Sequence, residues 1–139
     1  MSYKIVSKFI KDISFEIPNP KTFILLDKEI KNYKLTFDIK SKPYKDNIVE
    51  VNTILKLVPG NEVKDKMLTE INLTALITID TNIKDKKEIE KITLVKIPNE
   101  IYPTLYETFL YIFKQAGVKN IKIEKDINFE KLYLEKFGS

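Results

Sequence analysis

Apolar and polar residues alternate along four segments of the chain, with the period of two that is typical of half-buried β-strands. These segments are residues 3–17, 33–39, 48–58 and 67–79. In the first segment one face carries Ile5, Phe9, Ile13, Phe15 and Ile17. In the second, the apolar face is Tyr33, Leu35, Phe37 and Ile39. Turn signals such as Pro59-Gly60-Asn61 separate the segments, which favours an antiparallel sheet with one buried face.

The second half of the chain changes to helical spacing. Pro98-Asn99 predicts the start of a helix over residues 100–116, with Pro103 in its first turn and Gly117 after its end. A shorter helix is predicted from an N-cap at Asn128 to Phe137. Residues 80–91 mix lysines with acids and predict a solvated crossover. The expected fold is α+β, a single domain over residues 1–139 with a long and a short helix on one face of a four-stranded antiparallel sheet.

The predicted long helix is apolar around about half of its circumference. A helix on one sheet needs an apolar stripe of roughly 100°, so a second subunit is expected to cover the surplus. The alternative is that the last helix and the crossover cover it. The residues expected at an oligomer interface are Met67, Thr69, Ile71, Tyr106, Phe109, Leu110 and Phe113.

Composition removes several classes of function. The chain of 139 residues has no histidine and no cysteine, which excludes the usual general base and thiolate chemistry. No enzyme activity, cofactor or metal site is therefore expected. All 24 basic residues are lysines interleaved with 20 carboxylates, giving a net charge of +4, so no nucleic-acid partner is expected either. The charged N-terminus has no signal-peptide pattern and no run is long enough to span a membrane, which predicts a cytoplasmic protein.

Four motifs follow one another along the chain: Asp12-Ile13-Ser14-Phe15-Glu16-x-Pro18-Asn19, Leu68-x-Glu70, Pro98-Asn99 leading through Tyr102 to Pro103, and Ile127-Asn128-Phe129 with Leu132-Tyr133. Together, and in this order, they resemble the SecB family of bacterial protein-export chaperones. The chain departs from the family pattern in its basic pI of about 9.0. It also has Ile97 and Tyr106 where the family usually has cysteine and arginine, and residues 119–122 replace a proline-rich approach to the last helix.

The resemblance implies an ATP-independent holdase, assembled as a dimer of dimers, that delivers unfolded preproteins to the motor SecA. The SecA-binding positions that it implies are Asp12, Glu16, Leu68 and Glu70. All four lie opposite the apolar set of their strands. The client-binding positions that it implies are Tyr33, Leu35, Phe37, Tyr102, Leu132, Tyr133 and Phe137.

Three alternatives stay open. The acidic residues at the SecA-binding positions could be ordinary solvated carboxylates, and the client-binding residues could form the ordinary core of sheet and helices. SecB-like proteins also serve in toxin–antitoxin systems, where the partner is an antitoxin. A non-catalytic oligomer that binds one peptide or small ligand is the remaining reading.

Overall fold

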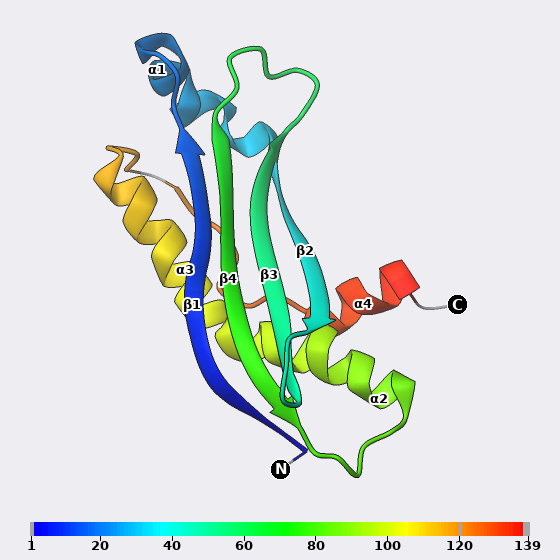
Figure 1. Ribbon diagram of the computed structural model, residues 1–139. Helices are drawn as coiled ribbons and strands as arrows, with labels where there is room; N and C mark the ends of the chain where they lie inside the picture. The colour runs from blue at the N-terminus through cyan, green and yellow to red at the C-terminus, as the bar shows by residue number, and fades with distance from the viewer. Residues whose placement is uncertain (1, 120, 138–139) are drawn as a thin grey trace.

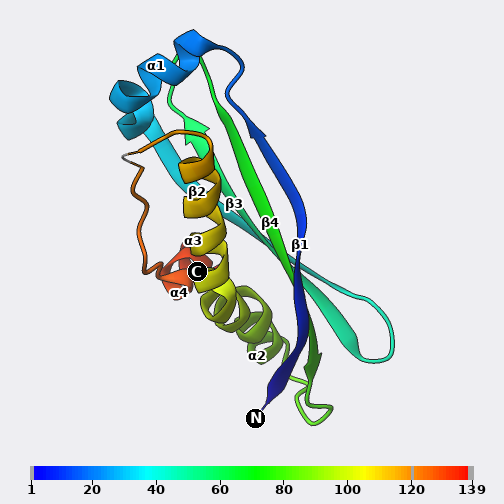
Figure 2. The ribbon, with the colours of Figure 1, turned by 90° about the vertical axis from the view of Figure 1, so that its left-hand side faces the viewer.

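The four predicted strands form one antiparallel sheet in the order β1-β4-β3-β2 (Figure 1). The computed structural model describes residues 2–119 and 121–137. The strands are β1 (Tyr3–Glu16), β2 (Tyr33–Pro43), β3 (Ile48–Pro59) and β4 (Leu68–Ile79). The main helices lie on one face of this sheet and leave the other face open (Figure 2). The predicted α+β class and antiparallel sheet are confirmed.

The two edge strands differ in regularity. β2 pairs with β3 over eleven consecutive positions, from Tyr33 with Pro59 to Pro43 with Val49, and the register does not shift. A tight turn through Asp46 and Asn47, whose φ angles are 51° and 66°, closes this hairpin. Positive φ at both central positions is the turn geometry that matches the twist of paired strands.

β1 pairs with β4 less regularly, because its register shifts between Ile5 and Ser7 and again between Ile10 and Asp12. Each shift reverses the face on which the following side chains lie. Phe9 therefore stands opposite Thr74 and is exposed on the open face, whereas Lys8 turns inward and bonds Thr104 of the long helix. The prediction that Phe9 shares a face with Ile5 and Ile13 is wrong for this reason.

A helix that the sequence reading missed follows β1. Helix α1 (Pro20–Glu29) and the 3₁₀ turn η1 (Ile30–Asn32) connect β1 to β2 at one end of the sheet (Figure 1). The side chain of Asn19 caps α1 by accepting a bond from the backbone N–H of Thr22, at 2.9 Å, and Pro20 occupies the first helical position. The Pro-Asn-Pro sequence thus ends a strand and also begins a helix.

The long helical segment begins earlier than predicted. Helix α2 (Lys86–Lys91) continues through a π-helical turn, η2 (Ile92–Lys96), into α3 (Ile97–Gln115). In η2 the N–H of Ile97 bonds the carbonyl of Ile92, five residues back. Proline has no N–H to donate, so this wider turn carries the chain past Pro98 without ending the helix. Pro103 consequently lies inside α3 and not in its first turn.

The other helix boundaries agree with the sequence reading. Gly117, with φ of 90°, follows the end of α3, and the N–H of Val118 closes the turn on the carbonyl of Phe113 at 3.0 Å. Helix α4 (Phe129–Phe137) begins where predicted, since Asn128 accepts a bond from the N–H of Lys131 at 2.9 Å.

The core lies between the inner sheet face and α3. Fully buried side chains from both layers meet there: Val51, Leu55, Ile71, Ile77, Ile101, Leu105, Phe109 and Phe113. This burial corrects the expected oligomer interface, because five of its residues belong to the core of one subunit and have almost no surface to offer a second: Met67, Thr69, Ile71, Phe109 and Phe113. Tyr106 and Leu110 are only partly buried and can still make such contacts.

Candidate functional site

An apolar groove follows the inner side of β2. It consists of three neighbouring cavities, numbered here from the Tyr33 end of β2 to the Ile39 end. Leu35 lines the first and the second cavity, and Phe37 lines the second and the third. The first two have volumes of about 610 Å³ and 440 Å³. The opposite wall is the extended segment 121–128 and then α4. We call this feature, from Tyr33 to Ile39, the β2 groove.

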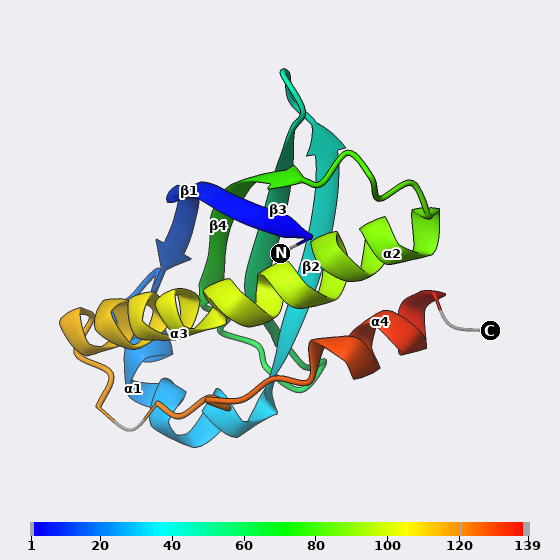
Figure 3. The same cartoon turned by 90° about the horizontal axis from the view of Figure 1, so that it is seen from below.

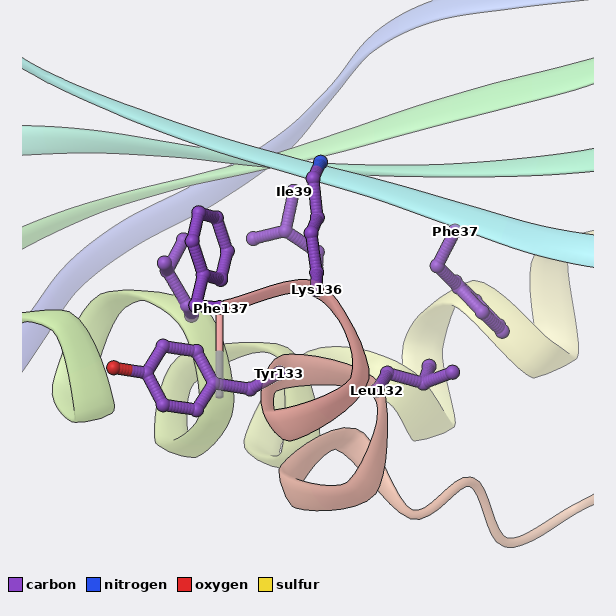
Figure 4. Close-up of a pocket in the computed structure, with 7 residues that line it drawn as sticks. Phe37, Ile39, Leu132, Tyr133, Lys136 and Phe137 are labelled. Atoms are coloured by element: carbon purple, nitrogen blue, oxygen red, sulfur yellow. The ribbon is translucent and has the colours of Figure 1, made fainter. Parts of the chain in front are cut away.

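Helix α4 supplies the apolar side chains at the far end of the β2 groove. Leu132, Tyr133 and Phe137 line a cavity with Phe37 and Ile39 of β2 (Figure 4). The hydroxyl of Tyr133 points away from β2 and donates to Glu90 of α2 at 3.2 Å. Leu132 is 37% exposed and Phe137 is also exposed, whereas Tyr133 is buried. The structure therefore brings the predicted client-binding residues of β2 and α4 together, and it leaves two of them accessible from solvent.

Besides Tyr133, two more of the predicted client-binding residues, Tyr33 and Tyr102, are buried. The hydroxyl of Tyr33 accepts a bond from the backbone N–H of Met67 at 2.9 Å, and burial raises the pKa of this hydroxyl. The hydroxyl of Tyr102 donates to the carbonyl of Glu124, and burial raises its pKa to about 12. Both tyrosines stay protonated at neutral pH. They hold the groove in shape and have little surface for a client.

The predicted SecA-binding residues gather at one corner of the open sheet face. Strand pairing places Glu16 opposite Leu68 and Ser14 opposite Glu70, with Asp12 two residues further along β1. Leu68 is 50% exposed, and Asp12 and Glu16 are also exposed. Glu70 forms an ion pair with Lys56 at 3.2 Å, so part of the negative charge at this corner is balanced within the chain.

A polar cluster on the same open face was not predicted. Glu50 accepts bonds from Lys11 at 2.9 Å and from the amide of Asn52 at 2.8 Å. Asn52 in turn accepts a bond from Thr74 at 2.7 Å, and both of these residues are buried. The Lys11 ammonium, helped by the Asn52 amide, holds the pKa of Glu50 below its usual value.

The groove and the open sheet face have the character of binding surfaces. Among the described residues, no group of three or more carboxylates is placed to hold a metal ion. Within the same part of the chain, no helix has the length and apolar character that crossing a membrane requires. What the structure presents is an apolar groove on one side of the sheet and a charged open face on the other.

Comparison with known proteins gives one consistent family. The family model for SecB, described as preprotein translocase subunit SecB, matches residues 1–138. A SecB protein-export protein of Pelagibacter ubique is 44% identical over 135 residues, which cover 97% of this chain and 96% of the relative. The protein-export protein SecB of Nitrosospira multiformis is 25% identical over 134 residues, covering 96% of this chain and 82% of the relative.

Solved structures show the same fold at low identity. The Rv1957 SecB-like chaperone of Mycobacterium tuberculosis, in complex with a ChAD peptide from the Rv1956 HigA1 antitoxin, matches with a TM-score of 0.52 at 14% identity. The match covers 88% of this chain and 90% of that one. A protein of unknown function from Streptococcus agalactiae matches with a TM-score of 0.54 at 12% identity, covering 88% and 96%.

The Glu50 cluster predicts a pH-dependent contribution to stability. Because the folded-state pKa of Glu50 is lowered, its contribution is present above the unfolded-state pKa and is lost as the pH falls through the folded-state pKa. Glu50→Gln should lower the free energy of unfolding by about 1 kcal/mol at neutral pH. Urea unfolding between about pH 7 and pH 3 should show this difference shrinking towards acid. The matched control is Glu107→Gln, an exposed position on α3. A difference that persists unchanged to pH 3 would contradict the role of the ion pair.

Proposed function

The chain belongs to the SecB family of protein-export chaperones, and we propose that it is an ATP-independent holdase that binds unfolded preproteins in the β2 groove. The observation that supports this most strongly is the groove itself, which joins the apolar side chains of β2 and α4 into one surface. Apolar burial has no preferred direction, so such a surface accepts many sequences. With about 3.3 Å per residue, the seven residues 33–39 form a wall of roughly 20 Å, long enough for a short extended segment.

We further propose that SecA receives the client at the corner formed by Asp12, Glu16, Leu68 and Glu70. This corner lies on the sheet face opposite the groove, so a partner there would leave the bound client in place. Charges at the rim of an interface chiefly affect encounter rate and salt dependence. The protein is proposed to act in the cytoplasm, where preproteins are still unfolded.

The rival role is that of a chaperone in a toxin–antitoxin system. The Mycobacterium tuberculosis SecB-like chaperone was solved with an antitoxin peptide, which shows that one protein of this fold meets such a partner. The internal Lys56–Glu70 pair also weakens the acidic corner on which a SecA interaction would depend. A dedicated peptide or ligand binder is a further possibility, and it differs from a holdase in that it would not suppress the aggregation of unrelated proteins.

We also propose a homotetramer, built through the exposed apolar residues of β1 and α3 and not through the core residues. The exposed set is Val6, Phe9, Ile10, Ile13 and Tyr111. β1 is an edge strand, so its outer backbone groups are available to a second copy. Several grooves in one oligomer would hold one long client at high effective concentration.

The first test compares two leucines of α4. Leu132 lines the β2 groove, whereas Leu134 is 54% exposed and lines none of the three cavities. Leu132→Ser should weaken the affinity for reduced, unfolded α-lactalbumin roughly fivefold, which corresponds to about 1 kcal/mol of lost apolar burial. Leu134→Ser should leave the affinity unchanged. Binding is measured by isothermal titration calorimetry without ATP, and equal losses in both variants would place the client elsewhere.

The second test concerns assembly. Wild-type protein should elute as a single species with four times the 16.3 kDa mass of the subunit, measured by light scattering after size exclusion. Ile13→Lys changes a β1 side chain that is 43% exposed and should shift the protein to smaller species, because a lysine there would have to be desolvated. Ile24→Lys, on α1 at a position that is 72% exposed, is the control and should not. A wild-type monomer at micromolar concentration would refute the tetramer.

The third test separates the export role from the toxin–antitoxin role. Wild type should bind the cognate SecA more tightly at low salt than at physiological salt. Glu70→Lys should reduce this binding while the affinity for unfolded client stays the same, and Glu88→Lys on α2 serves as the charge-matched control. If the wild type binds SecA at neither salt concentration but still binds clients, the export role is wrong and the antitoxin role becomes the better explanation.

A further inference from the structure

The corner that holds Leu68 and Glu70 carries a second exposed apolar side chain, Val58. Strand pairing matches Lys56 of β3 with Glu70 of β4, and the next residues on the same face of these strands are Val58 and Leu68. Val58 is 43% exposed and Leu68 is 50% exposed. Both lie at the end of the sheet from which β1 leads into α1 (Figure 1). An apolar centre of this kind, with polar residues around it, is the composition of a protein interface.

The charges change sign across this surface. The row of residues through Leu68 and Val58 begins at Glu16 on β1, which pairs with Leu68, and ends at Lys34 on β2, which pairs with Val58. Glu16 and Lys34 are both exposed. Neighbouring strands lie about 4.8 Å apart, so the two ends of the row are roughly 14 Å from one another. The corner is therefore negative along β1 and positive along β2, with the two apolar side chains between.

The ion pair in the next row has the same polarity. The ammonium of Lys56, on β3, lies 3.2 Å from the carboxylate of Glu70, on β4, and the two side chains remain 43% and 35% exposed. A lysine has three donors and a carboxylate has several acceptor positions, so both groups can bond a partner while they stay paired. Negative charge again lies towards β1, where Asp12 is also exposed, and positive charge lies towards β2.

Charges further along the open face are balanced within the chain. Glu50 is paired with Lys11 at 2.9 Å, and Asp38 is paired with Lys40 at 3.5 Å. These pairs do not change the polarity of the corner. A segment that carried only positive charge would meet Lys34 as well as the acids, and like charges placed together across an interface oppose binding.

We propose that this corner docks a partner segment of both signs, with an apolar residue over Leu68 and Val58, a lysine or arginine towards β1 and an aspartate or glutamate towards β2. This rests on the proposed partner corner and adds Val58, Lys34 and Lys56 to it. Two signs fix the direction in which the segment crosses the strands, whereas a purely acidic corner would accept a basic segment in either direction. The same charges reject segments of a single sign.

The test uses two capped seven-residue peptides, the two-signed Lys-Lys-Ala-Leu-Ala-Glu-Glu and the cationic Lys-Lys-Ala-Leu-Ala-Lys-Lys. In an extended peptide the inner charged residues are four positions apart, about 13 Å, which matches the row of the corner. Methyl NMR of leucine- and valine-labelled protein at low salt follows Val58 and Leu68 at the corner separately from Leu132 in the β2 groove. The two-signed peptide should shift the Val58 and Leu68 signals and bind there severalfold more tightly than the cationic peptide.

A charge reversal at one end of the row tests the role of the lysine. Lys34→Glu makes the corner acidic on both sides, so it should weaken the two-signed peptide, tighten the cationic peptide and thereby reverse their order. Lys42→Glu is the matched control, because it makes the same change of charge on the same face at the other end of β2. It should leave the order unchanged. The difference between the peptides should decrease as salt is added.

Titration of cognate SecA into the same labelled protein separates this inference from the proposed function. If the two-signed peptide shifts the corner signals and SecA does not, the SecA assignment fails and the two-signed surface stands. If SecA shifts these signals but the cationic peptide binds there as tightly as the two-signed one, or more tightly, the SecA corner stands and recognition of both signs is refuted. Peptides that shift only the Leu132 signal would also overturn the proposal.

Discussion

The arrangement of the groove depends on one aromatic cluster. Tyr102 of α3 packs edge-on against Phe37 of β2 and Phe129 of α4, with ring centroids 5.7 Å and 5.8 Å apart, and Phe37 contacts Phe129 at 5.2 Å. Three elements that are distant in sequence are thereby fixed to one another. The bond from the Tyr102 hydroxyl to the Glu124 carbonyl adds the extended segment to the same cluster. Because edge-to-face contacts have a preferred geometry, the width of the groove is set by these rings.

Alternation in the sequence was enough to predict the sheet, because one face is buried and the other is open. It failed where the backbone departs from regular pairing: the register shifts of β1 move Phe9 to the other face, and nothing in the local sequence marks them. Proline led to a second error, in the predicted start of the long helix. Pro98 was read as a helix start because proline is common there, whereas the π turn η2 carries the helix past it.

The sequence predicted which residues would lie at the candidate site, but not which of them are buried and which are accessible to solvent. The sequence could place Tyr33 and Tyr102 near Leu132 and Phe137 only through the family resemblance, and it could not show that the tyrosines are buried in the walls while the α4 residues stay accessible. The Glu50 cluster was beyond reach for a different reason. Lys11 and Glu50 are 39 residues apart, and they meet only because β4 lies between their strands in the sheet order.

An exposed regular edge is normally an aggregation hazard, so its persistence in β2 requires an explanation. Two copies pairing through this edge would bring rows containing Lys34, Lys40 and Lys42 side by side, and like charges on neighbouring strands repel. The row of charge therefore opposes pairing of the edge with itself. β1 also carries three lysines, Lys4, Lys8 and Lys11, but Lys8 and Lys11 are engaged with Thr104 and Glu50. That edge has less charge free to oppose self-association, which is consistent with β1 as the strand through which copies of the chain meet.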